Sequence, residues 1–498
     1  MTLIVDGHPF RYEMENLCRI FYPRSRITVT PEPNEDRVQA YTGLRGEPDG
    51  RRVTVRLSID GEERADEELL PAETDDRETE RHMAVLLWRM FAELLGYRPA
   101  WGILTGVRPI KLLGKLVEEM GEEEAADFFE NGFLVSRQKT ELALDTLRNQ
   151  KRLLSVSSPE AFSLYVAIPF CPTRCAYCSF VSSSVEKTLR LVPKYVDLLC
   201  GEIRRTGEIA AELHLRPASV YFGGGTPTVL SAEQLERLLR TVRESFDLSA
   251  CREFTVEAGR PDTITEDKLD VMKRGGVTRI SINPQTFNDA VLLEIGRRHT
   301  AAQTLEAFAL ARSRGFTDIN MDLIAGLPKD DPASFRRTLE QAVSLSPESV
   351  TVHTLALKRA ARLAQEDDAV PSGEGETVGR MIECADETLM QGGYRPYYLY
   401  RQSKMVGNQE NTGWAKPGFE CLYNVVIMEE CQTILACGAG AVTKLRDLDS
   451  DRIERIFNFK YPYEYIGRYE EMMLRKDRVK EFYGELQDRV CHIPEQRK

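Results

Sequence analysis

Beyond about residue 160, short runs of apolar, β-branched and aromatic residues alternate with longer segments that carry apolar residues at helical spacing. Two of the helical segments follow capping residues, Ser231 and Asp331. This alternation predicts a parallel sheet with right-handed crossovers, either a partial or closed barrel or an open sheet. The predicted strands are 163–168, 219–224, 253–258, 278–283, 318–324 and 349–354.

The two flanking regions have other patterns. Residues 1–155 begin with strand-like runs broken by Gly, Pro and acidic turns, and continue with the helical spacing of ERHMAVLLWRMFAELLGY. Residues 371–498 are less regular. We therefore expect an α/β protein with an α+β accessory domain of unknown role over 1–155, the strand–helix repeat over 156–370, and a C-terminal domain over 371–498.

Composition and charge narrow the class of protein. The 498 residues carry a net charge of −12, which argues against a broad nucleic-acid surface. No apolar stretch reaches the roughly 18 residues of a membrane span, and the first residues lack a secretory pattern. The 11 cysteines are odd in number and scattered, which favours a reducing compartment over a disulfide framework. We expect a cytoplasmic protein.

One loop gathers three cysteines. PFCPTRCAYCSF (169–180) places Cys171, Cys175 and Cys178 in a C-x3-C-x2-C spacing directly after a predicted strand. Structural zinc needs four ligands, and a redox pair needs only two cysteines. A 4Fe–4S cluster normally takes four thiolates, so three thiolates leave one iron open to a substrate or cofactor. The spacing therefore favours a cluster with an open coordination site.

This loop, with Tyr177 before its last cysteine, resembles the signature of radical S-adenosylmethionine (SAM) enzymes. The resemblance implies that Cys171, Cys175 and Cys178 hold a 4Fe–4S cluster whose open iron binds the amino and carboxylate groups of SAM. Electron transfer from the cluster then splits the sulfonium and releases a 5′-deoxyadenosyl radical.

Further motifs follow the other predicted strands, at the ends where parallel folds collect their chemistry. YFGGGTPT (221–228) exposes backbone N–H groups, and Glu257 can pair with an ammonium. Arg297 suits a carboxylate, and Asp322 suits ribose hydroxyls. Gln285 offers a donor and an acceptor, whereas Ala356 and Val442 are apolar and suited to adenine.

Over about 160–445 these motifs resemble the oxygen-independent coproporphyrinogen III oxidase family, and within it the branch of HemZ-type coproporphyrinogen dehydrogenases. Supporting stretches are GVRPIKLLGKL, VTVHTLALKR, PYYLYRQSKMVGNQENTGWAKPG and MEECQTILACGAGAVTKL. The resemblance implies a partial (βα)6 TIM-like barrel over 156–370 and a substrate-covering C-terminal elaboration. Residues similar to the contacts of one SAM are Tyr165, Gly224, Glu257 and Val442. Residues similar to the contacts of a second SAM are Tyr177, Gly225, Thr226, Gln285, Arg297, Asp322 and Ala356.

The family reaction is the oxidative decarboxylation of two propionates of coproporphyrinogen III to vinyl groups, which gives protoporphyrinogen IX in haem biosynthesis. It implies a tetrapyrrole substrate, an electron donor such as a flavodoxin or ferredoxin, and a monomer. Because the substrate carries four carboxylates, a cationic site is expected. Its candidate residues are those of LKRAAR (357–362), Arg395, Arg401 and Lys404.

Two positions depart from the oxidase pattern. Ala167 stands where the oxidases usually have His. Phe180 stands where the oxidases often have a cysteine, and in this it resembles the relatives that are haem chaperones. Two alternatives therefore stay open: a haem-binding chaperone with His353 or Cys421 as ligand, and a radical SAM methyltransferase that opens the haem ring.

Overall fold

The structure is a computed structural model that describes residues 1–32, 34–155, 158–178, 183–184, 188–356, 372–402 and 405–491. The predicted sites at Phe180, Lys404 and 357–362 lie outside these residues. The chain divides into two compact units, each described below by itself. The first unit comprises Met1–Asn149, Ile324–Leu339 and Val352–Gly413, and the second comprises Gln150–Leu323, Glu340–Thr351 and Trp414–Lys498. The domain borders at 155 and 370 stay predictions.

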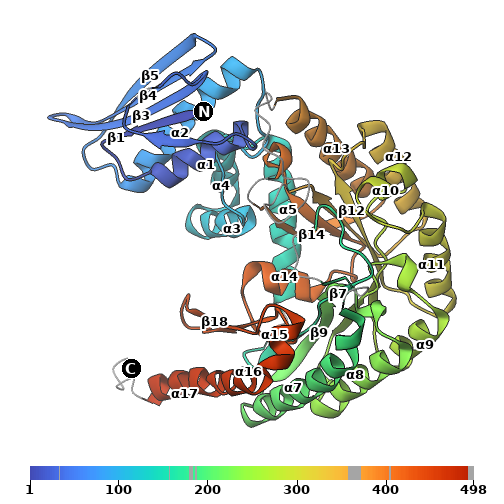
Figure 1. Ribbon diagram of the computed structural model, residues 1–498. Coiled ribbons are helices and arrows are strands. Elements are labelled where there is room, and N and C mark those ends of the chain that lie inside the picture. The colour runs from blue at the N-terminus through green and yellow to red at the C-terminus, as the bar shows by residue number, and fades with distance from the viewer. Residues whose placement is uncertain are drawn as a thin grey trace. The chain divides into compact units, whose positions relative to one another are not determined.

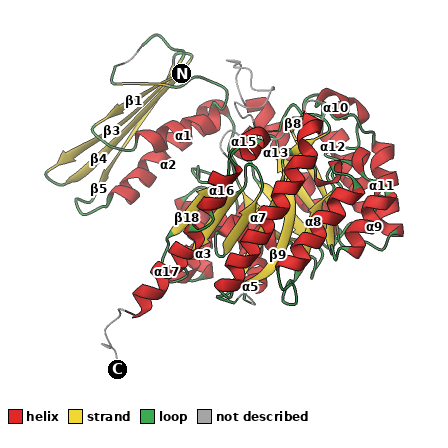
Figure 2. Ribbon diagram, turned by 60° about the horizontal axis from the view of Figure 1, so that its bottom comes forward, coloured by secondary structure: helices red, strands yellow, loops and turns green. Residues whose placement is uncertain are grey.

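The first unit opens with a five-stranded sheet in the order β2-β1-β3-β4-β5. Helices α1 and α2 lie along one face of this sheet (Figure 2). Asp75 caps α2 by accepting from Glu78 N, and Gly96 ends it in the left-handed region. The bounds are β1 Thr2–Asp6, α1 Arg11–Phe21, β2 Thr28–Thr30, β3 Val38–Glu47, β4 Gly50–Ile59, β5 Glu62–Leu70 and α2 Asp76–Leu95.

Helices and three further strands complete the first unit, where the strand order is β14-β15-β13. The unit boundary passes through α5, β12, α12, β13 and β15. The bounds are α3 Pro109–Met120, α4 Glu122–Asp127, the π-helical turn Phe128–Gly132, α5 Arg137–Leu154, α12 Pro332–Ser344, β13 Ser349–Thr354, α13 Ser372–Gln391, β14 Arg395–Tyr400, the 3-10 turn Val406–Asn408 and β15 Asn411–Ala415.

A buried charge network ties the first unit together. Lys139 on α5 donates to Asp386 of α13 at 2.8 Å and to Glu410 at 2.6 Å. The indole of Trp101 donates to the other oxygen of Glu410 at 2.6 Å. Because both carboxylates share one buried ammonium, α5, α13 and the segment before β15 are joined at a single point.

The second unit is built on a sheet in the order β12-β11-β10-β9-β6-β16-β17-β18. Its strands are parallel from β12 to β16, and β17 and β18 add an antiparallel ribbon. Helices α7, α8, α9 and α11 cover the outer face of the sheet (Figure 1). The parallel strands are β6 Ala161–Ile168, β9 Arg216–Gly224, β10 Glu253–Glu257, β11 Arg279–Ser281, β12 Ile319–Ala325 and β16 Thr433–Cys437. The antiparallel strands are β17 Val442–Arg446 and β18 Ile453–Phe457.

The predicted α/β class with a parallel sheet is confirmed, and the six predicted strands all occur. Among the described residues, no helix is both long enough and apolar enough to cross a membrane. The remaining elements are β7 Phe170–Cys171, β8 Ser183–Ser184, α7 Val192–Glu212, α8 Ala232–Ser245, α9 Glu266–Arg274, α10 Asp289–Glu294, α11 Ala301–Ser313, α14 Leu422–Glu429, α15 Pro462–Gly467, α16 Tyr469–Arg475 and α17 Arg478–Cys491, with 3-10 turns at Leu189–Leu191, Pro227–Val229 and Pro261–Thr263.

Candidate functional site

The cysteine loop leaves the carboxyl end of β6 and is held by backbone bonds from two other motifs. Cys171 pairs with Ser184 in the short parallel ladder of β7 and β8. Ala176 N donates to Ile295 O at 2.9 Å. Thr226 N donates to Phe170 O at 2.7 Å, and the Thr226 hydroxyl lies 3.5 Å from the Cys171 sulfur. The glycine turn and the segment before Arg297 therefore both fasten this loop.

The glycine turn after β9 approaches the same loop so closely that side chains are excluded. A Cβ atom at Gly225 would lie 2.5 Å from Phe170 O and 2.6 Å from Ile168 O. Gly224 has a φ of 97°, and the Tyr165 hydroxyl lies 3.1 Å from the position of a Cβ there. Glycine is required at both positions, by close approach at one and by backbone conformation at the other.

Glu257 ends β10 beside three stacked tyrosines. The Tyr221 hydroxyl donates to Glu257 Oε1 at 2.6 Å. The centroid of the Tyr221 ring lies 4.4 Å from that of Tyr423 and 6.3 Å from that of Tyr165. Burial raises the pKa of Glu257 to about 7; the Tyr221 hydrogen bond lowers it, and Asp322 raises it further. Tyr221 thus orients a carboxylate whose charge changes near neutral pH.

Asp322 and Gln285 lie together at the next strand ends. The amides of Asn283 and Asn320 each donate to one oxygen of the Asp322 carboxylate at 2.7 Å. Gln285 has a φ of 67° and donates its backbone N–H to Asp322 O at 2.9 Å. This left-handed conformation is rare outside glycine, and it marks Gln285 as a position held by its surroundings.

Arg297 links Tyr177 of the cysteine loop to Asn283. Its guanidinium donates to the Tyr177 hydroxyl at 3.2 Å and to Asn283 O at 2.8 Å. Burial opposes the charge of Arg297, but Tyr177 and Cys175 raise its pKa, so it stays a cation. The buried atoms Arg297 Nε and Gln285 Oε1 have no hydrogen-bond partner within the described part of the chain. Unpartnered polar atoms of this kind fit a site that binds a polar ligand.

The structure thus brings together most of the residues that the sequence singled out. Ala356 belongs to the first unit, where it forms an isolated antiparallel β-bridge with Met405. It is therefore not placed with the other candidate residues, which belong to the second unit. Val442 begins β17, beside Ala441, whose cluster with Ala167 and Ala436 packs against Tyr165. The roles of all these residues as cofactor contacts stay predictions.

The donor chemistry of the loop fits an iron–sulfur cluster, because three partly exposed thiols stand on one short segment beside hydroxyl and guanidinium donors. Within the described ranges, no three His, Cys, Asp or Glu side chains converge as a preformed metal site.

Three residues that sequence reasoning missed belong to this site. Tyr221 orients Glu257, Asn283 contacts both Asp322 and Arg297, and Arg260 lies beside the cysteine loop. Each of them stands two or three residues from a predicted site residue, namely Gly224, Gln285 or Glu257. This closeness in sequence was the available signal that they belong to the site. Their partners come from other strands, which the sequence alone does not pair.

Two other expected sites are occupied by internal contacts. The buried thiol of Cys421 donates to Glu253 at 3.1 Å, so it already has a partner within the second unit. Arg401 is buried in the first unit, where it donates to Leu104 O at 2.7 Å and to Asn408. Both therefore serve the fold in this structure.

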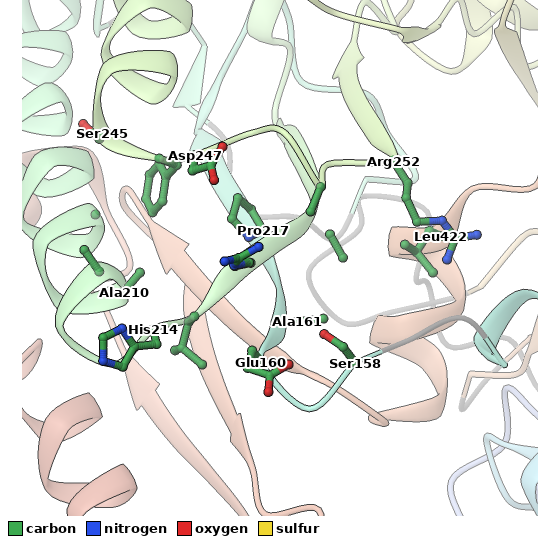
Figure 3. Close-up of a pocket in the computed structure, with 17 residues that line it drawn as sticks. Ser158, Glu160, Ala161, Ala210, His214, Pro217, Ser245, Asp247, Arg252 and Leu422 are labelled. Carbon is green, nitrogen blue, oxygen red and sulfur yellow. The ribbon is translucent and has the colours of Figure 1, made fainter.

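A cavity of about 730 Å³ lies at the opposite ends of the strands that carry the site (Figure 3). It is lined at the amino ends of β6, β9 and β10, by Ala161, Pro217 and Arg252 among others. None of the candidate cofactor residues lines this cavity. The two features are therefore separate.

A model of the radical SAM superfamily matches residues 165–342. The oxygen-independent coproporphyrinogen-III oxidase-like protein HemZ of Bacillus subtilis is 37% identical over 92% of this chain and 93% of its own length. The heme chaperone HemW of Haemophilus influenzae is 30% identical over 64% of this chain and 81% of its own length.

Among solved structures, the coproporphyrinogen III oxidase HemN of Escherichia coli, described as a radical SAM enzyme, matches with a TM-score of 0.51 and 27% identity. The match covers 65% of this chain and 73% of HemN. A radical SAM domain implies a 4Fe–4S cluster and SAM as cofactors. With a relative of 37% identity along nearly all of its length, the chain belongs to the HemZ/HemN-type family of the radical SAM superfamily.

Proposed function

We propose that this protein is an oxygen-independent coproporphyrinogen III dehydrogenase, which decarboxylates two propionates of its substrate to vinyl groups in haem biosynthesis. The observation that carries the proposal is the match to the oxidase-like relative along 92% of the chain. The haem chaperone relative matches only 64% of it. The extra length of the first match favours a function in common with the oxidase-like branch.

Cys171, Cys175 and Cys178 would hold the 4Fe–4S cluster, which with bound SAM supplies a 5′-deoxyadenosyl radical. Glu257, held by Tyr221, would accept the ammonium of SAM, and the glycine turn would offer its backbone N–H groups. Tyr165 and Val442 would complete this first SAM site.

A second SAM would be bound by residues of the cysteine loop, the glycine turn and later strand ends. Arg297 would pair with its carboxylate, and Asp322 would accept from its ribose hydroxyls. The unpartnered Gln285 Oε1 and Arg297 Nε support a ligand at this position. The remaining contacts within the second unit would be Tyr177, Gly225 and Thr226.

The substrate, donor and assembly state follow the same proposal. We propose a tetrapyrrole substrate, a flavodoxin or ferredoxin as electron donor, and a monomer acting without nucleic acid in the cytoplasm. Arg395 begins β14 with an exposed side chain and can meet a substrate carboxylate. Since Arg401 is buried and hydrogen-bonded, we assign it to the fold rather than to the substrate.

The experiment that tests the activity is anaerobic. The protein is purified, its cluster is reconstituted, and reductant, SAM and coproporphyrinogen III are added. We expect 5′-deoxyadenosine to form together with products that carry one and then two vinyl groups. Deoxyadenosine without any decarboxylated porphyrin would contradict the proposed substrate.

A second candidate function is haem binding without turnover, as a chaperone. The observation that favours it is the environment of Ala167, which is buried against Ala436 and Ala441. Because Ala167 is 3% exposed and packs in this cluster against Tyr165, an imidazole at this position would require its neighbours to move. A haem titration followed by absorbance distinguishes the two: tight, stoichiometric haem binding with no vinyl product would favour the chaperone.

The ionisation of Glu257 makes SAM binding depend on pH. The pKa of Glu257 is raised to about 7, so the carboxylate that pairs with an ammonium is lost as pH falls through 7. We expect SAM affinity to fall by up to about tenfold per pH unit below this value, since one proton is linked to binding. Calorimetry between pH 6 and pH 8 measures it, and E257Q removes both affinity and pH dependence.

The Tyr221 hydroxyl sets the position of this pH profile. Because its hydrogen bond lowers the pKa of Glu257, Y221F raises that pKa and moves the binding profile to higher pH. Y423F is the matched control, since it removes a hydroxyl from the same stack without touching the bond to Glu257. Equal shifts in both variants would contradict a specific role for Tyr221.

A further inference from the structure

We infer that Arg260 is a positioning residue that anchors the cysteine loop and places a fixed positive charge beside Cys175. The inference rests on the proposed cluster at Cys171, Cys175 and Cys178. It concerns how this chain holds and tunes that cluster, and it does not depend on which substrate the protein decarboxylates.

Arg260 is aimed at the loop by a carboxylate on its own segment. Its Nε and Nη2 atoms donate to the two oxygens of Asp262 at 3.1 Å and 3.2 Å. Its backbone oxygen accepts from the Thr263 hydroxyl at 2.7 Å. The side chain is 3% exposed, so this bidentate pair lies in a buried setting where its geometry is fixed.

The remaining nitrogen of Arg260 faces the cysteine loop. Nη1 donates to the Thr173 hydroxyl at 3.1 Å and lies 4.0 Å from the Cys175 sulfur. The Thr173 hydroxyl donates in turn to Gly296 O at 3.1 Å. Arg260 thereby joins the first residues of the loop to the segment that carries Arg297, and it reaches the middle cysteine from within the protein.

The surroundings of Arg260 keep this side of Cys175 positive. Arg297 stands nearby, where its guanidinium donates to the hydroxyl of Tyr177 in the same loop at 3.2 Å. The buried His299 has its Nδ1 atom 4.0 Å from Oδ1 of Asp262. Burial, together with the charges of Arg297 and Arg260, lowers the pKa of His299 to about 3. The imidazole is therefore neutral and adds no charge of its own beside the Arg260–Asp262 pair.

A buried cation beside a cluster ligand stabilises the reduced, more negative state of an iron–sulfur cluster, which raises its reduction potential. Arg260 therefore contributes to cluster retention through Thr173 and to cluster potential through its charge.

Reconstituted full-length variants separate these two contributions. R260Q removes charge and anchor, R260K keeps a charge, and T173A removes the anchor but keeps Arg260. We expect R260Q to lower the midpoint potential in a titration followed by electron paramagnetic resonance, and to lose iron faster to a chelator. R260K should recover much of the potential, whereas T173A should lose iron faster at an unchanged potential.

R240Q is the matched control, because Arg240 is an exposed cation of α8 and its loss changes net charge equally. It should match the wild type in both measurements. An R260Q potential and iron-loss rate equal to those of R240Q would overturn the inference. Failure of the wild type to bind any cluster would overturn it together with the proposed site, whereas a wild type that binds the cluster but forms no vinyl product would overturn only the proposed substrate.

Discussion

Alanine at Cys171, Cys175 or Cys178, one at a time, abolishes 5′-deoxyadenosine formation, and this is the largest loss of activity that we expect from a single residue. Each substitution leaves two thiolates where three are needed to hold the cluster with one iron open. The three positions should behave alike, because no other cysteine shares their loop. Deoxyadenosine is measured by chromatography after anaerobic incubation with SAM and reductant.

Iron content and a control variant show whether a loss of activity comes from the loss of a cluster ligand. C251A serves as the control, because Cys251 lies outside the loop and its thiol donates to Glu253 O at 3.2 Å. It should keep full iron content and full cleavage of SAM. If a loop variant kept a 4Fe–4S spectrum and cleaved SAM at the wild-type rate, that cysteine would not be a ligand.

Methionine at Lys139 lowers the free energy of unfolding by about 3–5 kcal/mol, the largest loss of stability that we expect. The substitution removes the only ammonium that the structure places between the buried carboxylates of Asp386 and Glu410 in the described part of this network. Two buried carboxylates then face each other without the cation that compensates their charge. Chemical denaturation followed by circular dichroism measures the loss.

Two further variants test the cause. R137M changes the same helix, α5, at an exposed pair with Glu141, and should cost less than about 1 kcal/mol. The triple variant K139M/D386N/E410Q removes all three charges and should recover much of the lost stability. An equal loss in K139M and in the triple variant would mean that packing, and not uncompensated charge, explains the effect.

The parallel strands could be predicted because each is a short apolar run between turn residues. The runs at 163–168, 219–224 and 349–354 correspond to β6, β9 and β13 within three residues at each end. β5 could not be predicted in this way, since EERADEELL is charged and reads as a turn or surface segment. An edge strand has one paired neighbour, and its pairing with β4 comes from backbone bonds that composition does not reveal.

Buried charges mark a second limit of sequence reasoning. Lys139 and Arg401 look like surface cations, yet each is buried because a partner from a distant part of the chain satisfies it. The residues of the candidate site were easier to predict, since Glu257 ends β10, Asp322 lies in β12 and Arg297 stands in the segment that connects β11 to α11. Tyr221 and Arg260 escaped notice because their importance comes from contacts with residues far away in sequence.

The place of β6 in its sheet bears on how the protein is made. The strand that leads into the cysteine loop is paired on one side by β9 and on the other by β16, which begins at Thr433, long after β6 ends at Ile168. At roughly 5–20 residues per second, the ribosome needs on the order of tens of seconds to supply that second partner. Until then one edge of β6 stays open to other chains. Messages cut short before β16 should therefore yield aggregation-prone products, and cluster insertion is best delayed until synthesis is complete.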